Sequence, residues 1–482
     1  MKRPKVLFQE PFVPRDVTFG KFAKGAGNNT FPYGVACIAS YIKEQGYDVL
    51  YLDPVMEQMV PERYIEYIRA NKIDLIGMGS TTLQISHVLD CFKLIRKHFP
   101  DIITVLGGVH ATLMPEETLE IADMIDYLIL GEGEKPFSRL LACLTTNDRD
   151  SIKTIDGICF RDGESLINNP PDFSACLTPE EMPVPLFEIF PMKQYVAQIT
   201  YSKTFPTYSI VASRGCPFNC SFCNASDTLG RKVRYKPVDI LLKEIRLLKE
   251  QYGARGIMFL DSTFTVNKAW VREFCAAYVK SGLDLPWACN SRVDTIDRDL
   301  AVIMRDAGCW TLLFGIESGN QKSLDLINKR TTVEQNTRAI RLCMELGLYV
   351  YTSYIICLPG ETEEDALNTI EYARSMGNHL AMFYLPVPYP KTRLWDTCKE
   401  MGGLRQDAKW SDFNSWDYTN PVYVNPLIGK EKMLNLYRKA YIRYYSNPRI
   451  WYKNLKEIVL MRQSPYRYVL GLRGFLNFLF SK

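Results

Sequence analysis

Strand-like and helix-like stretches alternate along most of the chain, in two blocks separated by a stretch rich in proline and glycine turns. Two parallel strands need a crossover connection, usually a helix, so this alternation restricts each block to a mostly parallel sheet covered by helices. The strand-like stretches are short apolar runs, as expected where both faces of a sheet are buried. We predict strands at 5–9, 48–52, 74–79, 102–106 and 127–130 in the first block, and at 208–213, 256–261, 287–291, 311–317, 349–357 and 380–385 in the second.

The two blocks predict two different α/β domains. Five strands with crossover helices in residues 1–145 predict a doubly wound, Rossmann-like parallel sheet, which binds ligands at the carboxyl ends of its strands. Residues 146–204 contain Asp-Gly and Pro-Pro breaks and predict a hairpin followed by a linker. Six β/α units in residues 205–390 predict a partial barrel of the TIM type, with functional groups where strands end. The alternation stops in residues 391–482, for which we expect a mostly helical extension.

The composition excludes several classes of protein. Hydrophobic content of 47% and charged content of 23% are typical of a soluble globular protein. A net charge of +4 is too small to indicate a nucleic-acid partner. No apolar stretch approaches the ~18 residues of a membrane-spanning helix, and the first apolar run is too short for a signal peptide. We therefore expect a cytoplasmic protein.

Three of the fourteen cysteines lie within eight residues, directly after the first strand of the second block. Cys216, Cys220 and Cys223 have the spacing C-x3-C-x2-C, and thiolates are the usual ligands of iron–sulfur clusters, which normally have four. Three local cysteines leave one iron open for a substrate, as catalytic zinc keeps an open position. A structural zinc site would need a fourth ligand, and no histidine is nearby in the sequence. Chance clustering is the other alternative, and the spacing and its place after a strand make both improbable.

The motif resembles the signature of the radical S-adenosylmethionine (radical SAM) superfamily. The resemblance implies a 4Fe–4S cluster on the three cysteines, with an open iron that chelates the amino and carboxylate groups of S-adenosylmethionine. It also implies that Phe222 lies near the adenine and Asp261 near the methionyl amine. Ser291, Arg292 and Glu317 end the third and fourth barrel strands and are candidates for ribose or carboxylate contacts. For each residue alone, a surface ion pair or a strand-end cap is an equally good explanation.

Small and hydroxyl-bearing residues end three predicted strands of the first block. Glycine lets the backbone approach a bulky ligand, and hydroxyl groups can hydrogen-bond a polar tail. Without further information these segments are also compatible with ordinary turns or a generic nucleotide site. The candidate residues are Ser80, Thr81 and Thr82, then Gly107, Gly108 and His110, then Gly131, Glu132 and Gly133.

Joined to the barrel, this order of domains resembles the cobalamin-binding radical SAM enzymes over roughly residues 1–400. The segment from Phe31 to Gly34 and the glycine turns fit that pattern. The Asp-x-His-x-x-Gly signature, whose histidine ligates cobalt in other cobalamin proteins, is absent. The resemblance therefore implies base-off cobalamin with no protein histidine on the metal. His110 remains a candidate polar contact, although a turn histidine is at least as good an explanation.

The resemblance implies reductive cleavage of S-adenosylmethionine to a 5′-deoxyadenosyl radical, which removes hydrogen from an unactivated carbon. We expect methyl transfer from cobalamin to that carbon of a small-molecule or lipid-like metabolite, on family analogy alone. An alternative is cobalamin-dependent oxidative ring closure, as in the anaerobic magnesium-protoporphyrin cyclase. A third alternative, of another class, is a corrinoid-binding sensor without turnover. An enzyme of this kind needs an electron donor such as flavodoxin or ferredoxin.

The C-terminal region is basic and aromatic. From Arg438 onward there are ten Lys or Arg residues and one acidic residue. Tyr437, Tyr441, Tyr444 and Tyr445 fall at helical spacings. One hypothesis is a peripheral helix that docks on anionic lipid; the alternative, which we favour, is a helical extension packed on the barrel. We also expect pocket residues among four aromatic side chains, Tyr384, Tyr389, Trp395 and Trp416.

Overall fold

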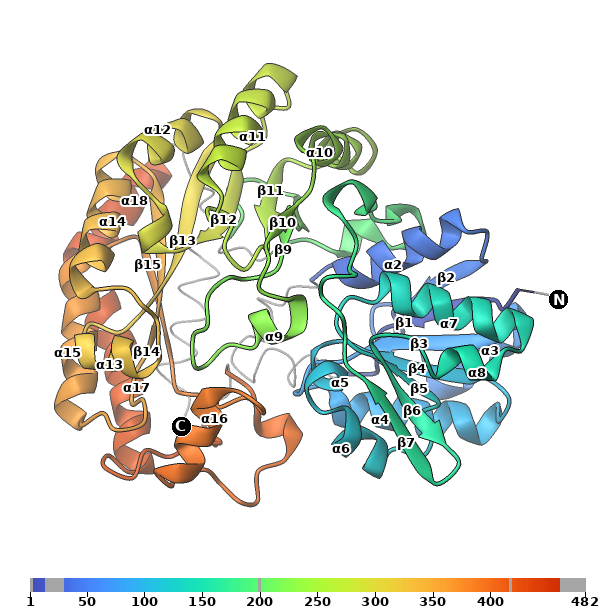
Figure 1. Cartoon of the computed structure of the whole chain (residues 1–482). Coiled ribbons are helices and arrows are strands. Elements are labelled where there is room, and N and C mark those ends of the chain that lie inside the picture. Colours follow the sequence, from blue (N-terminus) through green and yellow to red (C-terminus); the bar gives the residue numbers. More distant parts are fainter. Residues whose placement is uncertain (1–2, 14–29, 198–200, 416–417, 460–482) are drawn as a thin grey trace.

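The structure is a computed structural model that describes residues 3–13, 30–197, 201–415 and 418–459. Two sheets lie side by side, each with its own helices, and the last helices pack on the far side of the second sheet (Figure 1). The fold class expected from the alternation of strands and helices is confirmed. None of the helices in the described residues combines the length and the hydropathy that a membrane-spanning segment requires.

The first sheet has seven strands in the order β2-β1-β3-β4-β5-β6-β7. The first five run parallel, and their order places a topological switch point between β1 and β3, where ligands bind in open α/β sheets. The predicted hairpin adds β6 and β7 antiparallel to this sheet, which therefore extends beyond residue 145. The strands are β1 (Val6–Gln9), β2 (Val49–Leu52), β3 (Leu75–Gly79), β4 (Ile103–Gly107), β5 (Tyr127–Ile129), β6 (Ile158–Asp162) and β7 (Ser165–Asn169).

Helices cover both faces of this sheet. Along β1, Val6 and Phe8 belong to one apolar core and Leu7 to another, because successive side chains of a strand point to opposite faces. The first core includes residues of α2 and α7, which contact each other, and the second includes residues of α3, α4 and α6. The helices are α2 (Tyr33–Glu44), α3 (Pro61–Asn71), α4 (Ile85–His98), α5 (Val109–Leu113), α6 (Pro115–Ile121), α7 (Glu134–Thr146) and α8 (Arg149–Ile152).

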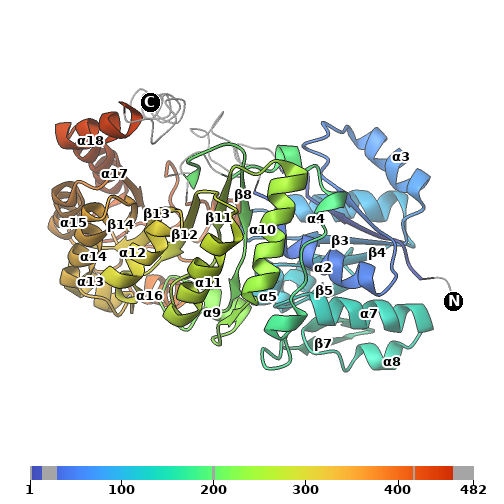
Figure 2. The same cartoon turned by 90° about the horizontal axis from the view of Figure 1, so that it is seen from above.

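The second sheet has six parallel strands paired in chain order, with β8 and β15 at its edges. It curves into an open barrel with helices on its outer side, as Figures 1 and 2 show. The strands are β8 (Thr207–Ile210), β11 (Gly256–Phe259), β12 (Trp287–Ser291), β13 (Cys309–Glu317), β14 (Tyr349–Ile355) and β15 (Leu380–Tyr384). The helices between them are α9 (Ala225–Leu229), α10 (Val238–Tyr252), α11 (Lys268–Ser281), α12 (Arg298–Asp306), α13 (Gln321–Leu326), α14 (Val333–Glu345) and α15 (Glu363–Met376).

The region after residue 390 is helical where it is regular, with α16 (Arg393–Glu400), α17 (Lys430–Tyr445) and α18 (Pro448–Val459). The tyrosines of α17 pack on the barrel: the Tyr441, Tyr444 and Tyr445 hydroxyls donate to the carbonyl oxygens of residues 383, 378 and 381 at 3.1, 2.7 and 2.8 Å. A helical extension packed on the barrel is therefore confirmed for α17. The apolar segment 466–480 and Trp416 lie outside the described residues.

Candidate functional site

The cysteine loop is closed at its base by a two-stranded ribbon. Ser213 and Arg214 form β9, which pairs antiparallel with β10 (Arg234–Tyr235). The Cys216 amide donates to the Gly230 carbonyl at 3.0 Å across the loop. Gly215 has φ +97°, and a Cβ there would collide with the Lys232 carbonyl oxygen. Only glycine fits this position, so the turn delivers Cys216 directly from the end of the ribbon.

All three cysteines of the motif line one cavity of about 380 Å³ at the carboxyl ends of the barrel strands; we call it the cysteine cavity. Burial raises the pKa of the Cys216 thiol. Such thiols lose their protons when they bind a metal. In the described part of the chain, no three His, Cys, Asp or Glu side chains converge closely enough for a single ion. A cluster that binds each cysteine through a different iron does not require such convergence, whereas a mononuclear zinc site does.

Arg292 places a cation beside the cysteines. Its Nη1 lies 3.7 Å from Cys220 Sγ, and its guanidinium lies 3.7 Å from the centre of the Phe218 ring. The group is oriented by Asp294 and by the Lys329 carbonyl, which accepts from Nη2 at 2.8 Å. A fixed cation stabilises the negative charge of thiolate ligands.

Glu317 and Lys329 form a buried ion pair on the wall of the cysteine cavity, with 2.7 Å between Oε1 and Nζ. Glu317 has φ +66° and lies where the pairing of β13 and β14 shifts register, so the strand is re-aimed at this point. The Lys329 ammonium lies 5.7 Å from the centre of the Phe222 ring. Lys329 is not among the residues predicted from the sequence, because it follows a helix and not a strand. The basic pair Lys329-Arg330 is its one signal in the sequence.

Of the other residues predicted for S-adenosylmethionine, Phe222 and Ser291 line the cysteine cavity and Asp261 does not. The Ser291 hydroxyl lies 2.6 Å from the Thr265 hydroxyl. The Asp261 carboxylate accepts from the Ser213 hydroxyl at 2.5 Å and from the Ala212 amide at 3.2 Å, and it lines a second cavity. Burial raises the pKa of Asp261 to about 6.

The second cavity, of about 520 Å³, lies at the carboxyl ends of the first-sheet strands; we call it the sheet cavity. From the barrel, Val211, Ser213, Arg214 and residues 260–262 face it. Its volume is within the usual range for small-molecule sites. A Cβ added at Gly34 or Gly79 would meet no atom within 4 Å, and both glycines line this cavity. The sequence thus leaves space open at the switch point, where a side chain would otherwise fill it. Open space beside glycine backbone lets a bulky ligand such as a corrin approach the strand ends closely.

Most residues predicted for cobalamin line the sheet cavity: Ser80, Thr81, Gly107, Gly108, Gly131, Glu132 and Gly133. Gly108 has a packing reason as well, because at φ +91° a Cβ would lie 2.7 Å from the Ser80 backbone. Thr82 and His110 do not line the cavity. They are buried together, with 3.2 Å between His110 Nδ1 and the Thr82 hydroxyl, and the His110 ring packs on Trp410. Burial lowers the pKa of His110 to about 4, which favours the neutral ring.

Glu132 is held by arginines from both strands of the cysteine ribbon. Arg214 donates to Glu132 at 3.0 Å and to Glu134 at 2.6 Å, and Arg234 also pairs with Glu132. The four side chains are each 10% exposed or less. Arg234 further donates to the Leu177 carbonyl at 2.7 Å. These residues join the glycine turn, the linker and the cysteine loop, and we call the four charged residues the ionic latch.

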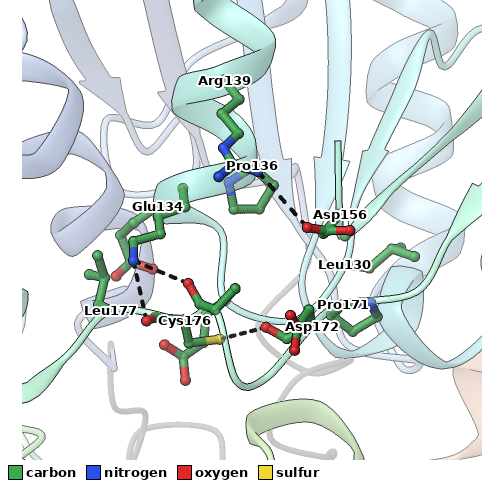
Figure 3. A pocket seen from close by; sticks show the side chains of 13 residues that line it. Leu130, Glu134, Pro136, Arg139, Asp156, Pro171, Asp172, Cys176 and Leu177 are labelled. Atoms are coloured by element: carbon green, nitrogen blue, oxygen red, sulfur yellow. Dashed lines mark hydrogen bonds and ion pairs between the residues drawn. The ribbon is translucent and has the colours of Figure 1, made fainter. Parts of the chain in front are cut away.

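The linker backs the latch closely, as Figure 3 shows for Glu134, Cys176 and Leu177. The cavity between them is only about 30 Å³, which is about the share of liquid volume of one water molecule. We therefore regard it as a packing defect and not as a ligand site. A second buried ion pair at the domain contact, Lys236 with Glu244 at 2.7 Å, also binds the Tyr33 hydroxyl.

Three of the four aromatic side chains predicted in the pocket are described. Tyr384 lines the cysteine cavity together with Tyr201 and Tyr351. Tyr389 and Trp395 pack instead on Phe413, so they contribute to the core of the C-terminal region.

Comparison with known proteins matches both parts of the site. Residues 210–373 match the radical SAM superfamily, and residues 23–141 match the B12 binding domain. An uncharacterized methyltransferase of Pyrococcus horikoshii is 32% identical over 457 residues, covering 95% of this chain and 96% of its own. The anaerobic magnesium-protoporphyrin IX monomethyl ester cyclase of Rubrivivax gelatinosus is 29% identical, covering 86% of this chain and 74% of that protein.

Among solved structures, the radical S-adenosylmethionine methyltransferase TsrM from Kitasatospora setae, with cobalamin and a 4Fe–4S cluster bound, has the same fold. Its TM-score is 0.72 at 17% identity, and the match covers 92% of this chain and 89% of that one. Because both domains match, the protein is an enzyme, and its cofactors are a 4Fe–4S cluster, S-adenosylmethionine and cobalamin. The absence of a histidine ligand to cobalt stays a prediction. The chain belongs to the cobalamin-binding radical S-adenosylmethionine enzyme family.

Proposed function

We propose that the protein transfers a methyl group to an unactivated carbon of a small-molecule or lipid-like metabolite. The observation that carries the proposal is the wall at residues 260–263, which borders the cysteine cavity on one side and the sheet cavity on the other. A carbon at this wall can be reached from both cofactor sites. The balanced reaction converts R–H, two S-adenosylmethionine and two electrons into R–CH3, 5′-deoxyadenosine, methionine and S-adenosylhomocysteine.

The bound groups supply chemistry that side chains lack: the cluster supplies an electron and cobalamin supplies a carrier for the methyl group. In our proposal the chain positions them. Cys216, Cys220 and Cys223 hold three irons, and Arg292 stabilises the negative charge at Cys220. The buried pair of Glu317 and Lys329 faces S-adenosylmethionine, together with Phe222 and Ser291. Asp261 is proposed as a support for the wall between the cavities, since its carboxylate is already hydrogen-bonded there.

On the other side of the wall, we propose that the strand ends of the first sheet hold the corrin and exclude water from it. The residues of this proposal are Ser80, Thr81, Gly107, Gly108, Gly131 and Gly133, with Gly34 and Gly79 as the cradle. Glu132 acts indirectly, because its carboxylate is occupied by two arginines. Thr82 and His110 are proposed as packing residues beneath this surface.

The function is tested by incubating the reduced, cofactor-loaded protein with methyl-labelled S-adenosylmethionine and a metabolite extract. Methyl transfer predicts label in a product and 5′-deoxyadenosine in comparable amounts. Ring closure, the reaction of the cyclase relatives, would give 5′-deoxyadenosine without labelled product. A corrinoid sensor would give neither. The last two outcomes each contradict the proposal.

Two partners belong to the same proposal. The reaction needs a one-electron donor of low potential, such as a flavodoxin or a ferredoxin.

A peripheral lipid contact is supported by α18, where Trp451, Tyr452 and Leu455 are 50%, 70% and 58% exposed beside Lys456. Co-sedimentation with anionic and neutral vesicles, for the parent protein and for the double variant Tyr452→Ser with Leu455→Ser, tests the contact. Equal sedimentation of both proteins with both vesicles would remove it.

A further inference from the structure

The wall between the two cavities is a short segment after β11, and one residue of it stands out. Ser262 lines both the cysteine cavity and the sheet cavity, and no other residue in the described part of the chain is common to the two linings. Its neighbours Asp261 and Thr263 are 1% and 5% exposed, whereas Ser262 is exposed. The side chain at position 262 therefore lies where the two cavities meet.

The backbone on either side of Ser262 is anchored to the neighbouring strands. The Leu260 amide donates to the Ile210 carbonyl at 2.9 Å. The Asn290 side chain donates to the Asp261 carbonyl at 3.1 Å, and the Phe264 amide donates to the Asn290 carbonyl at 3.0 Å. Because the segment is fixed to both β8 and β12, a larger side chain at 262 would have to extend into the cavities and could not be relieved by a shift of the wall.

We propose that Ser262 is the positioning residue at which methyl transfer between the two cavities takes place, and that its small size keeps the passage open. The proposal rests on the proposed function and deepens it. In each cycle the methyl group moves from S-adenosylmethionine, on the cysteine side, to cobalamin, on the sheet side, and then to the substrate carbon. Both movements use the boundary that Ser262 lines, so bulk at this position blocks transfer without removing a ligand of either cofactor.

The first movement can be tested without knowing the substrate. The carbon–sulfur bond of S-adenosylmethionine breaks and leaves S-adenosylhomocysteine, and the new carbon–cobalt bond takes its electron pair from cobalamin reduced by titanium(III) citrate. The probe is methyl-labelled S-adenosylmethionine added to the cluster- and cobalamin-loaded protein. The readout is the initial rate at which label is recovered with cobalamin.

We expect Ser262→Leu to slow this rate at least tenfold and Ser262→Val to give an intermediate rate, whereas Ser262→Ala slows it less than threefold. Ser165→Leu, which adds the same bulk at an exposed serine of β7, is the matched control and should behave as the parent protein. Two further readouts, cobalamin absorption on binding and the change in the cluster's electron paramagnetic resonance on adding S-adenosylmethionine, should be the same in all variants.

A parent-like rate in Ser262→Leu would overturn the inference, and so would loss of either binding signal, since the effect would then be loss of a cofactor. Ser262→Val decides the question in the same way if the leucine variant does not fold. A parent protein that never labels cobalamin contradicts the proposed function itself, so the two failures are distinguishable.

Discussion

Arg214 Nη2 lies 2.6 Å from Glu134 Oε1, which ties the residue two positions before the first cysteine of the motif to the glycine turn of the other domain. The same guanidinium reaches Glu132, which also binds Arg234 from the opposite strand of the ribbon. A buried pair of this kind is weak evidence for stability, because desolvation offsets much of the attraction. Its effect is geometric: the cysteine loop and the floor of the sheet cavity keep one relative position.

Removing one charge from the ionic latch should destabilise the folded protein. Arg214→Met leaves Glu132 and Glu134 buried with less compensation, and breaking such a group lowers the free energy of unfolding by about 3–5 kcal/mol. Arg214→Lys keeps a positive charge but lacks the planar guanidinium that reaches both carboxylates. We therefore expect it to restore part of the lost free energy of unfolding. Denaturant unfolding measures both variants, with cobalamin affinity as the second readout. Arg231→Met, an exposed arginine of the same loop, is the control and should stay within about 0.5 kcal/mol.

The cluster ligands are tested by single Cys→Ala variants at 216, 220 and 223. The cluster has only three protein thiolates as ligands, and each variant removes one of them. We therefore expect loss of the iron–sulfur absorption and at least a hundredfold lower 5′-deoxyadenosine formation. Cys143→Ala and Cys176→Ala, both partly exposed cysteines outside the cavity, should keep the cluster. Normal iron content in any one of the three variants would remove that residue from the ligand set.

Variants of the buried pair of Lys329 and Glu317 should affect the stability of the protein and its affinity for S-adenosylmethionine differently. Lys329→Met leaves the Glu317 carboxylate, which is 8% exposed, without its cation. The variant should therefore lower both the free energy of unfolding and the affinity for S-adenosylmethionine. In the double variant Lys329→Met with Glu317→Gln, no buried charge is left uncompensated, and stability should return. If both residues face the cosubstrate, affinity stays at least tenfold lower, a loss of about 1.4 kcal/mol. Recovery of affinity together with stability would show a purely structural pair. The control is Lys280→Met, which removes an exposed lysine of α11.

Sequence patterns predicted the order of strands and helices well, because apolar runs and crossover helices are local properties of the chain. They could not predict where side chains point at the strand ends. Thr82 and His110 follow β3 and β4 within three residues, yet both are buried away from the sheet cavity. Asp261 faces the sheet cavity and not the cysteine cavity. The ionic latch was equally hidden, since Arg214 and Glu132 are 82 positions apart and only the packed domains bring them together.

The buried histidine gives a pH dependence with a definite sign. The pKa of His110 falls from 6.5 to about 4 on folding because burial disfavours the charged ring. Between these values the unfolded chain binds a proton that the folded chain does not, so the His110 contribution to stability is present above pH 6.5 and is lost toward pH 4. The difference amounts to about 3 kcal/mol.

We expect His110→Gln to flatten the fall in unfolding free energy between pH 6.5 and 4, measured by denaturant titration at a series of pH values. The exposed His98 provides the control His98→Gln, which should leave the slope unchanged. Cobalamin binding by His110→Gln should be close to that of the parent protein at pH 7.5, because His110 does not line the sheet cavity. Loss of binding in this variant would instead return His110 to the cobalamin site.

The glycine cradle predicts a graded loss of cobalamin binding without loss of folding. A Cβ at Gly79 would meet no atom within 4 Å, so larger residues there occupy the sheet cavity instead of displacing the core. Gly79 ends a strand, and branched side chains are favoured in strands, so stability should hold or rise. We expect cobalamin affinity to fall in the order Gly79→Ala, Gly79→Val, Gly79→Leu, by at least tenfold at leucine, in equilibrium dialysis with hydroxocobalamin. Unchanged affinity across the series, with all three variants folded, would place the corrin elsewhere.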